Sequence, residues 1–380
     1  MWVGDIEAST SFGVIRTVLE RLARGEKIFS LAIGEPLYDT PREIMDIASE
    51  DMFNGDTHYT SSLGTDDVRD AIIGKVSRQN SINAELRNAI FMSSRHAIYT
   101  TLLALGNRKG EVLVPDPGYF YTNPARLAGF DPVPYHLSDD NSLDVSMIED
   151  GISDKTTAIF LNTPSNPTGR VADRNVLKEI LELAVEHDLS IISDEAYEDL
   201  VYEKKHVSVG SMEDAPDRVI SIFTLSKSYS MTGWRAGYTI AAESIVNNMA
   251  KVMDHSFSCY PPFVQKASAY ALRNGDGFIR KFQGEFREKR DFVEKRLNEI
   301  DGIISSPVEG AFYAFPRYEK NIGSSELANN LLEKKSVAVL PGVAFGDRGE
   351  KHVRISFSGN LETLEEGLDR FEEYMNTLSP

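Results

Sequence analysis

Short apolar runs alternate with amphipathic stretches through the first two thirds of the chain. Four runs stand out, at residues 111–114 (EVLV), 157–161 (TAIFL), 189–192 (LSII) and 219–223 (VISIF). Such runs are typical of parallel strands buried on both faces of a sheet. Residues 173–188 have one apolar stripe at helical spacing, and Asp173 can cap that helix. The pattern predicts an α/β fold with helices flanking a mostly parallel sheet.

The pattern changes near residue 275. A long, highly charged helix and a terminal helix are predicted by apolar stripes at Phe282, Phe286, Val293, Leu297 and Ile300, and at Leu361, Leu364, Leu368, Phe371 and Met375. Short strands are predicted between them, at 311–315, 337–340 and 353–357. This alternation indicates a smaller α+β domain that follows the large α/β domain.

Composition narrows the possible partners. Lys plus Arg is 40 and Asp plus Glu is 58, which gives a net charge of −18. An acidic surface repels nucleic acid and anionic membranes, so we expect neither as a partner. The chain has one cysteine, Cys259, and its seven histidines are scattered, so we expect no disulfide and no metal site. No apolar stretch approaches a membrane span, and we expect a cytoplasmic protein.

Polar motifs follow three of the apolar runs directly. Asn166 follows the second run, Asp194 and Tyr197 follow the third, and Lys227 and Arg235 follow the fourth. Ligands of open α/β sheets bind beyond the carboxyl ends of the strands, so neighbouring parallel strands would bring these residues together. A shielded lysine can form an imine, a carboxylate can keep a ring nitrogen protonated, and arginine with hydroxyls suits a phosphate. Pyridoxal 5'-phosphate (PLP) is a cofactor that requires these three features: a lysine for the imine, an acid at the ring nitrogen and donors for its phosphate.

The same motifs resemble those of class I/II aminotransferases of PLP fold type I, the group that includes aspartate aminotransferase. The resemblance extends from about residue 30 to residue 360. Its motifs are 32–36 (AIGEP) with 39–41 (DTP), 59–64 (YTSSLG), 115–119 (PDPGY), 165–169 (SNPTG), 193–197 (SDEAY), 226–235 (SKSYSMTGWR) and 353–357 (VRISF). It implies a large PLP-binding domain at 41–274, a small α+β domain at 275–380, and an N-terminal segment, 1–40, that packs with the small domain.

The resemblance also implies catalytic roles at the cofactor ring. Lys227 would form the imine with PLP and then act as the base that moves the substrate's α-proton. Asp194 would pair with the pyridine nitrogen, and Tyr119 would stack on the ring. Asn166 and Tyr197 would hydrogen-bond the phenolic oxygen, which lowers the pKa of the imine.

Further implied roles concern the phosphate and the substrate. Arg235, Thr224, Ser226 and the backbone amides of Ser94 and Arg95 would hold the phosphate. Tyr59 would reach the phosphate of the neighbouring subunit, which requires a homodimer. Arg354 would bind the substrate α-carboxylate, together with Asn166 and the backbone of Gly34.

Several alternatives stay open. Asp194 could instead cap a helix that starts at Glu195. One aromatic residue among Tyr119, Phe120 and Tyr121 would stack on the ring, and Tyr119 is our choice. The family usually has glycine where this chain has Ser94 and Arg95, so Arg95 could point into the pocket. There it could bind a distal carboxylate, which would indicate aspartate or glutamate as substrate.

Transamination between an amino acid and a 2-oxo acid, by a ping-pong route through a Lys227 imine, is the function that we expect. The same scaffold supports other PLP reactions: C–S β-lyase, aminocyclopropane-carboxylate synthase and decarboxylase chemistry. A PLP-binding transcription regulator is a non-enzyme alternative. The early start of the motifs and the negative charge argue against it.

Overall fold

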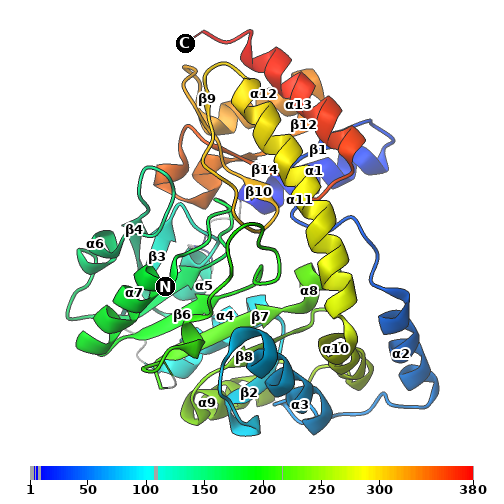
Figure 1. The fold of residues 1–380 in the computed structure, drawn as a ribbon, viewed down its shortest axis with the longest axis vertical. Coiled ribbons are helices and arrows are strands. Elements are labelled where there is room, and N and C mark those ends of the chain that lie inside the picture. Colours follow the sequence, from blue (N-terminus) through cyan, green and yellow to red (C-terminus); the bar gives the residue numbers. More distant parts are fainter. Residues whose placement is uncertain (1–3, 5, 7–9, 107–109, 216, 380) are drawn as a thin grey trace.

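A seven-stranded sheet forms the centre of the larger lobe, in the order β2-β8-β7-β6-β5-β3-β4 (Figure 1). The computed structural model describes residues 4, 6, 10–106, 110–215 and 217–379. The strands are β2 (Ala89–Phe91), β3 (Glu111–Asp116), β4 (Asp131–His136), β5 (Thr156–Asn162), β6 (Ser190–Asp194), β7 (Val219–Thr224) and β8 (Gly237–Ile240). Strands β7 to β4 are parallel, whereas β8 runs antiparallel to β7 and β2. The predicted α/β fold with a mostly parallel sheet is confirmed.

The four predicted apolar runs form β3, β5, β6 and β7, which are consecutive neighbours in this sheet. Successive residues of β6 enter different cores: Ile192 packs with Phe160 in one cluster and Ile191 packs with Ile159 in the other. Both faces of the strands are therefore buried, which explains why the runs show no alternation of polar residues.

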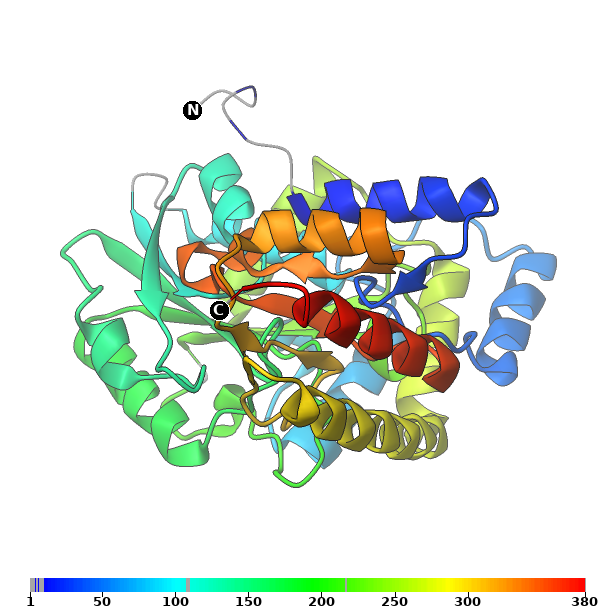
Figure 2. The ribbon, with the colours of Figure 1, turned by 90° about the horizontal axis from the view of Figure 1, so that it is seen from above.

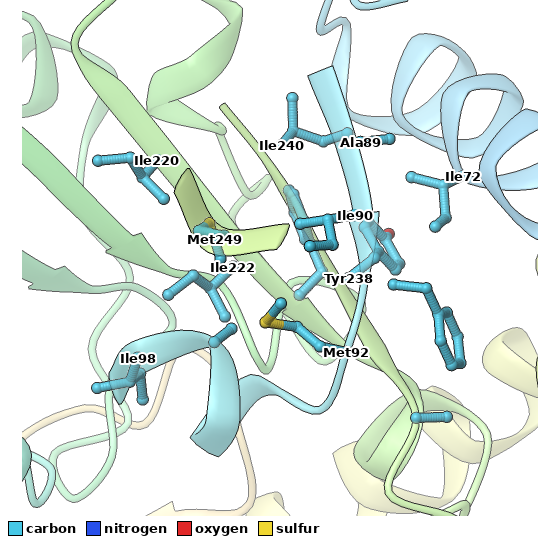
Figure 3. Packing of buried hydrophobic residues seen from close by; sticks show 14 of the residues in the cluster. Ile72, Ala89, Ile90, Met92, Ile98, Ile220, Ile222, Tyr238, Ile240 and Met249 are labelled. Carbon is cyan, nitrogen blue, oxygen red and sulfur yellow. The ribbon is translucent and has the colours of Figure 1, made fainter. Parts of the chain in front are cut away.

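Helices cover both faces of the sheet. On one side the core includes residues of α2 (Arg42–Phe53), α3 (Asp66–Lys75), α4 (Ser94–Leu105), α5 (Thr122–Ala128), α9 (Glu243–Asp254) and α10 (Pro262–Asn274). Figure 3 shows part of this core around β2 and β8, where Ile72 of α3, Ile98 of α4 and Met249 of α9 join the strand residues. The core of the other side includes residues of α6 (Val145–Glu149) and α7 (Arg174–Glu186).

Helix α7 corresponds to the stretch predicted at 173–188, but its predicted cap is wrong. Asp173 occupies the N-cap position without a side-chain hydrogen bond to the helix. Its Oδ1 instead lies 2.9 Å from Nζ of Lys204. The carboxylate of Asp173 thus forms an ion pair with Lys204 instead of capping the helix.

The smaller lobe contains α11 (Asp276–Glu299), α12 (Ser324–Lys335) and α13 (Leu361–Met375). Strand β14 (Val353–Ser356) lies between β10 (Tyr313–Ala314) and β13 (Leu340–Pro341), and β9 (Ile303–Ile304) pairs with β11 (Arg317–Tyr318). Figure 1 shows α11 running from beside α10 up to α13, and Figure 2 shows α11, α12 and α13 across the outer side of this lobe. The long charged helix and the terminal helix lie where their apolar stripes predicted them.

The N-terminal segment joins the smaller lobe. Strand β1 (Phe29–Ser30) pairs in parallel with β12 (Val337–Ala338), and Val18 of α1 (Thr10–Ala23) packs against Leu332 of α12. The chain then continues through Gly34 toward the carboxyl ends of the sheet strands. Further short helical turns lie at Val76–Asn80, Leu86–Asn88, Val209–Ser211, Gly342–Phe345 and Asp347–Gly349.

Candidate active site

The three polar motifs meet at one edge of the sheet. Asn162 at the end of β5 is in register with Asp194 at the end of β6, and Asp194 is in register with Ile222 of β7. Helix α8 (Leu225–Ser228), which follows β7, carries Lys227. The prediction that these strands are parallel neighbours, and that their carboxyl ends bring the motifs together, is confirmed.

A cavity of about 430 Å³ opens at this edge, between the two lobes. Twelve of its lining residues were singled out from the sequence: Gly34, Ser94, Arg95, Tyr119, Asn166, Asp194, Tyr197, Thr224, Ser226, Lys227, Arg235 and Arg354. Phe120 was considered only as an alternative to Tyr119, and six others were not singled out: Ile15, Asn162, Ala196, Thr232, Tyr313 and Leu340. The volume suits a small-molecule ligand, for which pockets of about 300–1,000 Å³ are usual.

Asp194 is buried at the end of β6 with two hydrogen bonds. Its Oδ2 accepts from the hydroxyl of Tyr121 at 2.8 Å, and its Oδ1 accepts from the amide of Ala196 at 3.2 Å. Residues 196–199 form a turn, so Asp194 caps no helix here. Burial raises the pKa of Asp194 to about 6, while the two hydrogen bonds and the charge of Arg95 oppose this rise. With this pKa the carboxylate is mostly ionised at neutral pH although it is buried.

Lys227 extends from α8 into the cavity, where its Nζ donates to the carbonyl of Gly34 at 2.7 Å. Burial lowers the pKa of this amine to about 8; Glu35 opposes the change, and the charges of Arg354 and Arg235 reinforce it. A lower pKa raises the fraction of the amine that is neutral at pH 7, and the neutral amine has a free electron pair on its nitrogen. An amine in this state is suited to attack a carbonyl carbon.

One end of the cavity is suited to an anion. Helix α4 begins at Ser94, and Gly237 makes room for it, because a Cβ there would lie 3.2 Å from the amide nitrogen of Ser94. The hydroxyl of Thr224 donates to that of Ser226 at 3.0 Å and accepts from the Ser226 amide at 3.2 Å. Arg235 lies beyond them with a left-handed φ of 56°. A helix N-terminus, hydroxyls and a guanidinium together provide the donors that a phosphate needs.

Arg354, on β14, supplies a second anion site. It is 3% exposed, and its described partners are neutral: Nη1 donates to Oδ1 of Asn166 at 3.0 Å and Nη2 to the carbonyl of Ala32 at 2.7 Å. Its Nε has no hydrogen-bond partner among the described residues. A buried guanidinium with an unpaired N–H is costly unless a ligand carries the opposite charge, so this position favours a carboxylate.

The aromatic residues after β3 take different places. Tyr119 and Phe120 line the cavity, whereas Tyr121 lies beneath it and contacts Asp194. Arg95 also lines the cavity and donates to the hydroxyl of Tyr119. The remaining predicted residue, Tyr59, is 91% exposed and does not line the cavity of its own chain.

The donor set of this cavity fits PLP. A phosphate would meet Ser94, Thr224, Ser226 and Arg235, and the amine of Lys227 and the guanidinium of Arg354 line the same cavity. The buried carboxylate of Asp194 has the chemistry of the acidic partner that a pyridine nitrogen requires. The fold and this site define a PLP-dependent enzyme of fold type I.

Comparison with known proteins narrows the class to a family. The model of the family "Aminotransferase class I and II" matches residues 26–371. An aspartate aminotransferase of Pyrococcus abyssi is 38% identical over 370 residues, 95% of each chain. Aromatic-amino-acid aminotransferase 2 of Thermococcus litoralis is 38% identical over 364 residues, 93% of each chain. A solved aspartate aminotransferase from Thermus thermophilus with maleate has a TM-score of 0.92, with 29% identity and 98% of each chain covered.

The chain belongs to the class I and II aminotransferases. It is a PLP-dependent enzyme that transfers an amino group between an amino acid and a 2-oxo acid. Among the described residues, no helix is long and apolar enough to cross a membrane.

Proposed function

We propose that the cavity between the lobes is the transamination site and that Lys227 is its central residue. The observation that carries this proposal is the convergence of the Lys227 amine, the Asp194 carboxylate and the unpaired Nε of Arg354 on one cavity. Bound PLP supplies an electron sink for the bonds of the substrate's α-carbon. The chain's own residues hold the reactants, exclude water and move the α-proton.

The role of each residue follows from its place. The Lys227 amine would hold the cofactor, and as a free base it would take the proton from the substrate α-carbon. Arg354 and the Gly34 backbone orient the substrate carboxylate, and Asp194 keeps the pyridine nitrogen protonated. Thr224, Ser226, Arg235 and the backbone amides of Ser94 and Arg95 would hold the phosphate. Tyr119 would stack on the ring, and Asn166 and Tyr197 would hydrogen-bond the phenolic oxygen.

Absorbance spectroscopy of the purified protein tests this function. We expect a visible band from the Lys227-bound cofactor that is lost when a suitable amino acid is added and returns when a 2-oxo acid follows. Glutamate, aspartate, alanine and phenylalanine are added in turn to identify the donor. A band that forms but never completes this cycle would favour lyase or decarboxylase chemistry, and the absence of a band after PLP addition would refute the site.

We propose an acidic amino acid as the substrate, because the positive charge of Arg95 could bind a second carboxylate. Its guanidinium lines the cavity beside Tyr119, and relatives of the chain include aspartate aminotransferases. We expect Arg95→Ala to raise the KM for aspartate or glutamate by about tenfold to a hundredfold, the loss of one charge-assisted hydrogen bond, and to change the KM for alanine much less. Steady-state kinetics with the three donors measure this selectivity. An equal rise for all three would place Arg95 at the phosphate instead.

We also propose a homodimer in which Tyr59 serves the partner's site. Tyr59 is almost fully exposed, yet its neighbour Thr60 is fixed by hydrogen bonds to Cys259 and Gln265. An exposed aromatic side chain on an anchored segment is typical of an interface residue. We therefore expect Tyr59→Phe to raise the dissociation constant of PLP by about tenfold, since one hydrogen bond to the phosphate is lost.

Mixing two variants tests whether Tyr59 acts across the interface. Lys227→Ala and Tyr59→Phe proteins are combined, dissociated and reassembled at low PLP concentration. If Tyr59 acts on the partner, each hybrid dimer contains one site with both changes and one intact site, so activity rises above that of either parent. If Tyr59 acts within its own chain, no intact site forms and activity stays at the parental mean.

The domain organisation that we propose has three parts. Residues 41–274 form the PLP-binding domain and 275–380 the small domain, with the N-terminal segment 1–40 packed on the small domain. The β1–β12 pairing and the start of α11 at Asp276 support this division, and residues 1–3, 5 and 7–9 lie outside the described part. A single cysteine in the chain suits the reducing cytoplasm, which we propose as its location.

A further inference from the structure

Tyr313 lines the active-site cavity although it belongs to the smaller lobe and to none of the motifs recognised in the sequence. It is the first residue of β10 and pairs with Ser356 of β14, two residues beyond Arg354. The side chain is 1% exposed. Its hydroxyl lies 2.9 Å from the hydroxyl of Tyr197, which comes from the turn after β6.

The neighbours of Tyr313 fix its ring. The guanidinium carbon of Arg354 lies 4.2 Å from the ring centroid, a cation–π contact. The ring of Tyr197 meets it edge-on, with the centroids 5.6 Å apart and an interplanar angle of 83°. A Cβ at Gly34 would collide with the Tyr313 hydroxyl, so the glycine provides the space that this hydroxyl occupies. The contacts with Arg354, Tyr197 and Gly34 therefore hold the Tyr313 hydroxyl in one position.

The hydrogen bonds around Tyr197 determine where its proton can point. Oδ1 of Asn166 accepts from Arg354 at 3.0 Å, which turns the Nδ2 donor of Asn166 toward the Tyr197 hydroxyl, 3.4 Å away. The phenol oxygen of Tyr197 has two acceptor positions and one proton. Asn166 occupies one of these positions, and the hydroxyl of Tyr313 can donate to the other.

We propose that Tyr313 is a positioning residue whose hydroxyl donates a hydrogen bond to the hydroxyl oxygen of Tyr197 and thereby directs the Tyr197 O–H into the cavity. With both acceptor positions filled, the proton of Tyr197 is left for a ligand atom. A donor into the Tyr197 oxygen also polarises its O–H bond and makes it a stronger donor. The inference rests on the proposed role of Tyr197 at the phenolic oxygen of the cofactor.

Both hydroxyls keep their protons under working conditions. Burial raises the pKa of Tyr197 well above the ordinary tyrosine value and raises that of Tyr313 as well. Neither phenol is therefore ionised at neutral pH, and each has one proton to donate. Tyr313 can therefore donate a hydrogen bond to Tyr197, and Tyr197 can donate one to the ligand.

The test is a double-mutant cycle read from the pH titration of the visible band of the PLP-loaded protein, without amino acid. Hydrogen bonds donated to the phenolic oxygen lower the midpoint of this titration. We expect Tyr197→Phe to raise the midpoint by about one pH unit and Tyr313→Phe by about half a unit. In the Tyr197→Phe background, Tyr313→Phe should cause no further change, because its hydroxyl acts through Tyr197.

A matched control separates this effect from the loss of any buried hydroxyl. Tyr318 is also 1% exposed and lies in the same apolar cluster, and its hydroxyl donates to the carbonyl of Ile322 at 3.1 Å. Tyr318→Phe should leave the midpoint unchanged. Thermal unfolding of all the variants verifies that each is folded at the temperature of the titration.

Each other outcome overturns a defined statement. An unchanged midpoint in Tyr313→Phe, beside a raised midpoint in Tyr197→Phe, overturns the inference alone. The same shift from Tyr313→Phe in both backgrounds also overturns it, because the hydroxyl would then act independently of Tyr197. An unchanged midpoint in Tyr197→Phe refutes the proposed role of Tyr197 and, with it, the role of Tyr313.

Discussion

Replacing Lys227 with alanine should reduce turnover by about four orders of magnitude or more. The substitution removes the amine that we propose both to hold the cofactor and to move the α-proton, and positioned bases alone contribute about 10²- to 10⁴-fold. The visible band should be absent from the variant free of added amino acid. Single-turnover kinetics and the absorbance spectrum measure both effects.

A surface lysine provides the control for Lys227. Lys251, on α9, is exposed and its Nζ donates to Asn248 at 3.1 Å. Lys251→Ala removes the same charge and the same side-chain length at a position away from the cavity, so turnover should not change. Retention of more than about one hundredth of the normal turnover by Lys227→Ala would contradict the double role of the amine.

The lowered pKa of Lys227 adds a pH dependence to this prediction. With a pKa of about 8, roughly one in ten of the amines is neutral at pH 7, against about one in 2,500 for an ordinary lysine. Acetylation of the Lys227 peptide in the cofactor-free protein should rise about tenfold per pH unit below pH 8 and then level off. A rate that still rises tenfold between pH 9 and pH 10 would contradict the lowered pKa.

Much of the larger lobe could be predicted because its central strands are buried on both faces. Burial on both sides demands apolar residues at consecutive positions, and the four runs stand out for that reason. Parallel strands end at one edge of the sheet, so the motifs after β5, β6 and β7 had to meet. The approximate positions of Asn166, Asp194 and Lys227 follow from these two facts.

Other strands gave weaker signals for identifiable reasons. Strand β4 is an edge strand with two prolines, Pro132 and Pro134, which periodicity alone does not assign to a sheet. Strand β2 has three residues and β8 has four, too few for a period to show. Their places depend on pairing with distant segments rather than on their own composition.

The second layer of the active site was also missed by sequence reasoning. Tyr121 meets Asp194 across 73 positions and Tyr313 meets Tyr197 across 116. Contacts between residues so far apart in the chain produce no local sequence pattern. From the sequence alone, a tyrosine in such a contact cannot be distinguished from one that only packs in the core. The sequence signal for Tyr313 was that it lies in a predicted strand, 311–315, of the same small domain as the predicted strand that carries Arg354.

Asp194→Asn is the second change for which we expect a large loss. Asparagine keeps the size and one carbonyl oxygen of the side chain, and Tyr121 can still donate to that oxygen at its present distance of 2.8 Å. The substitution removes the negative charge that would hold the pyridine nitrogen protonated, and with it the oxygen that accepts from the amide of Ala196. Removing one partner of a buried ion pair costs about 3–5 kcal/mol, which corresponds to about 10²- to 10⁴-fold in turnover.

Stability separates this charge effect from damage to the fold. The pKa of Asp194 is raised to about 6, so the folded protein holds the carboxylate less favourably than the unfolded chain does at neutral pH. The penalty is fully present above pH 6 and disappears as the pH falls toward the ordinary value for aspartate. The cofactor-free Asp194→Asn protein should therefore unfold at the same temperature as the parent or higher, while turnover falls.

Tyr121→Phe is the matched variant for this prediction. It removes the hydroxyl that contacts Asp194 and leaves the charge in place, so turnover should fall by only about tenfold, the worth of one hydrogen bond. The expected order of activity is parent, Tyr121→Phe, then Asp194→Asn, with unfolding temperatures that do not follow that order. A loss below tenfold in Asp194→Asn would show that the carboxylate, although buried at the end of β6, does not control the protonation of the cofactor ring.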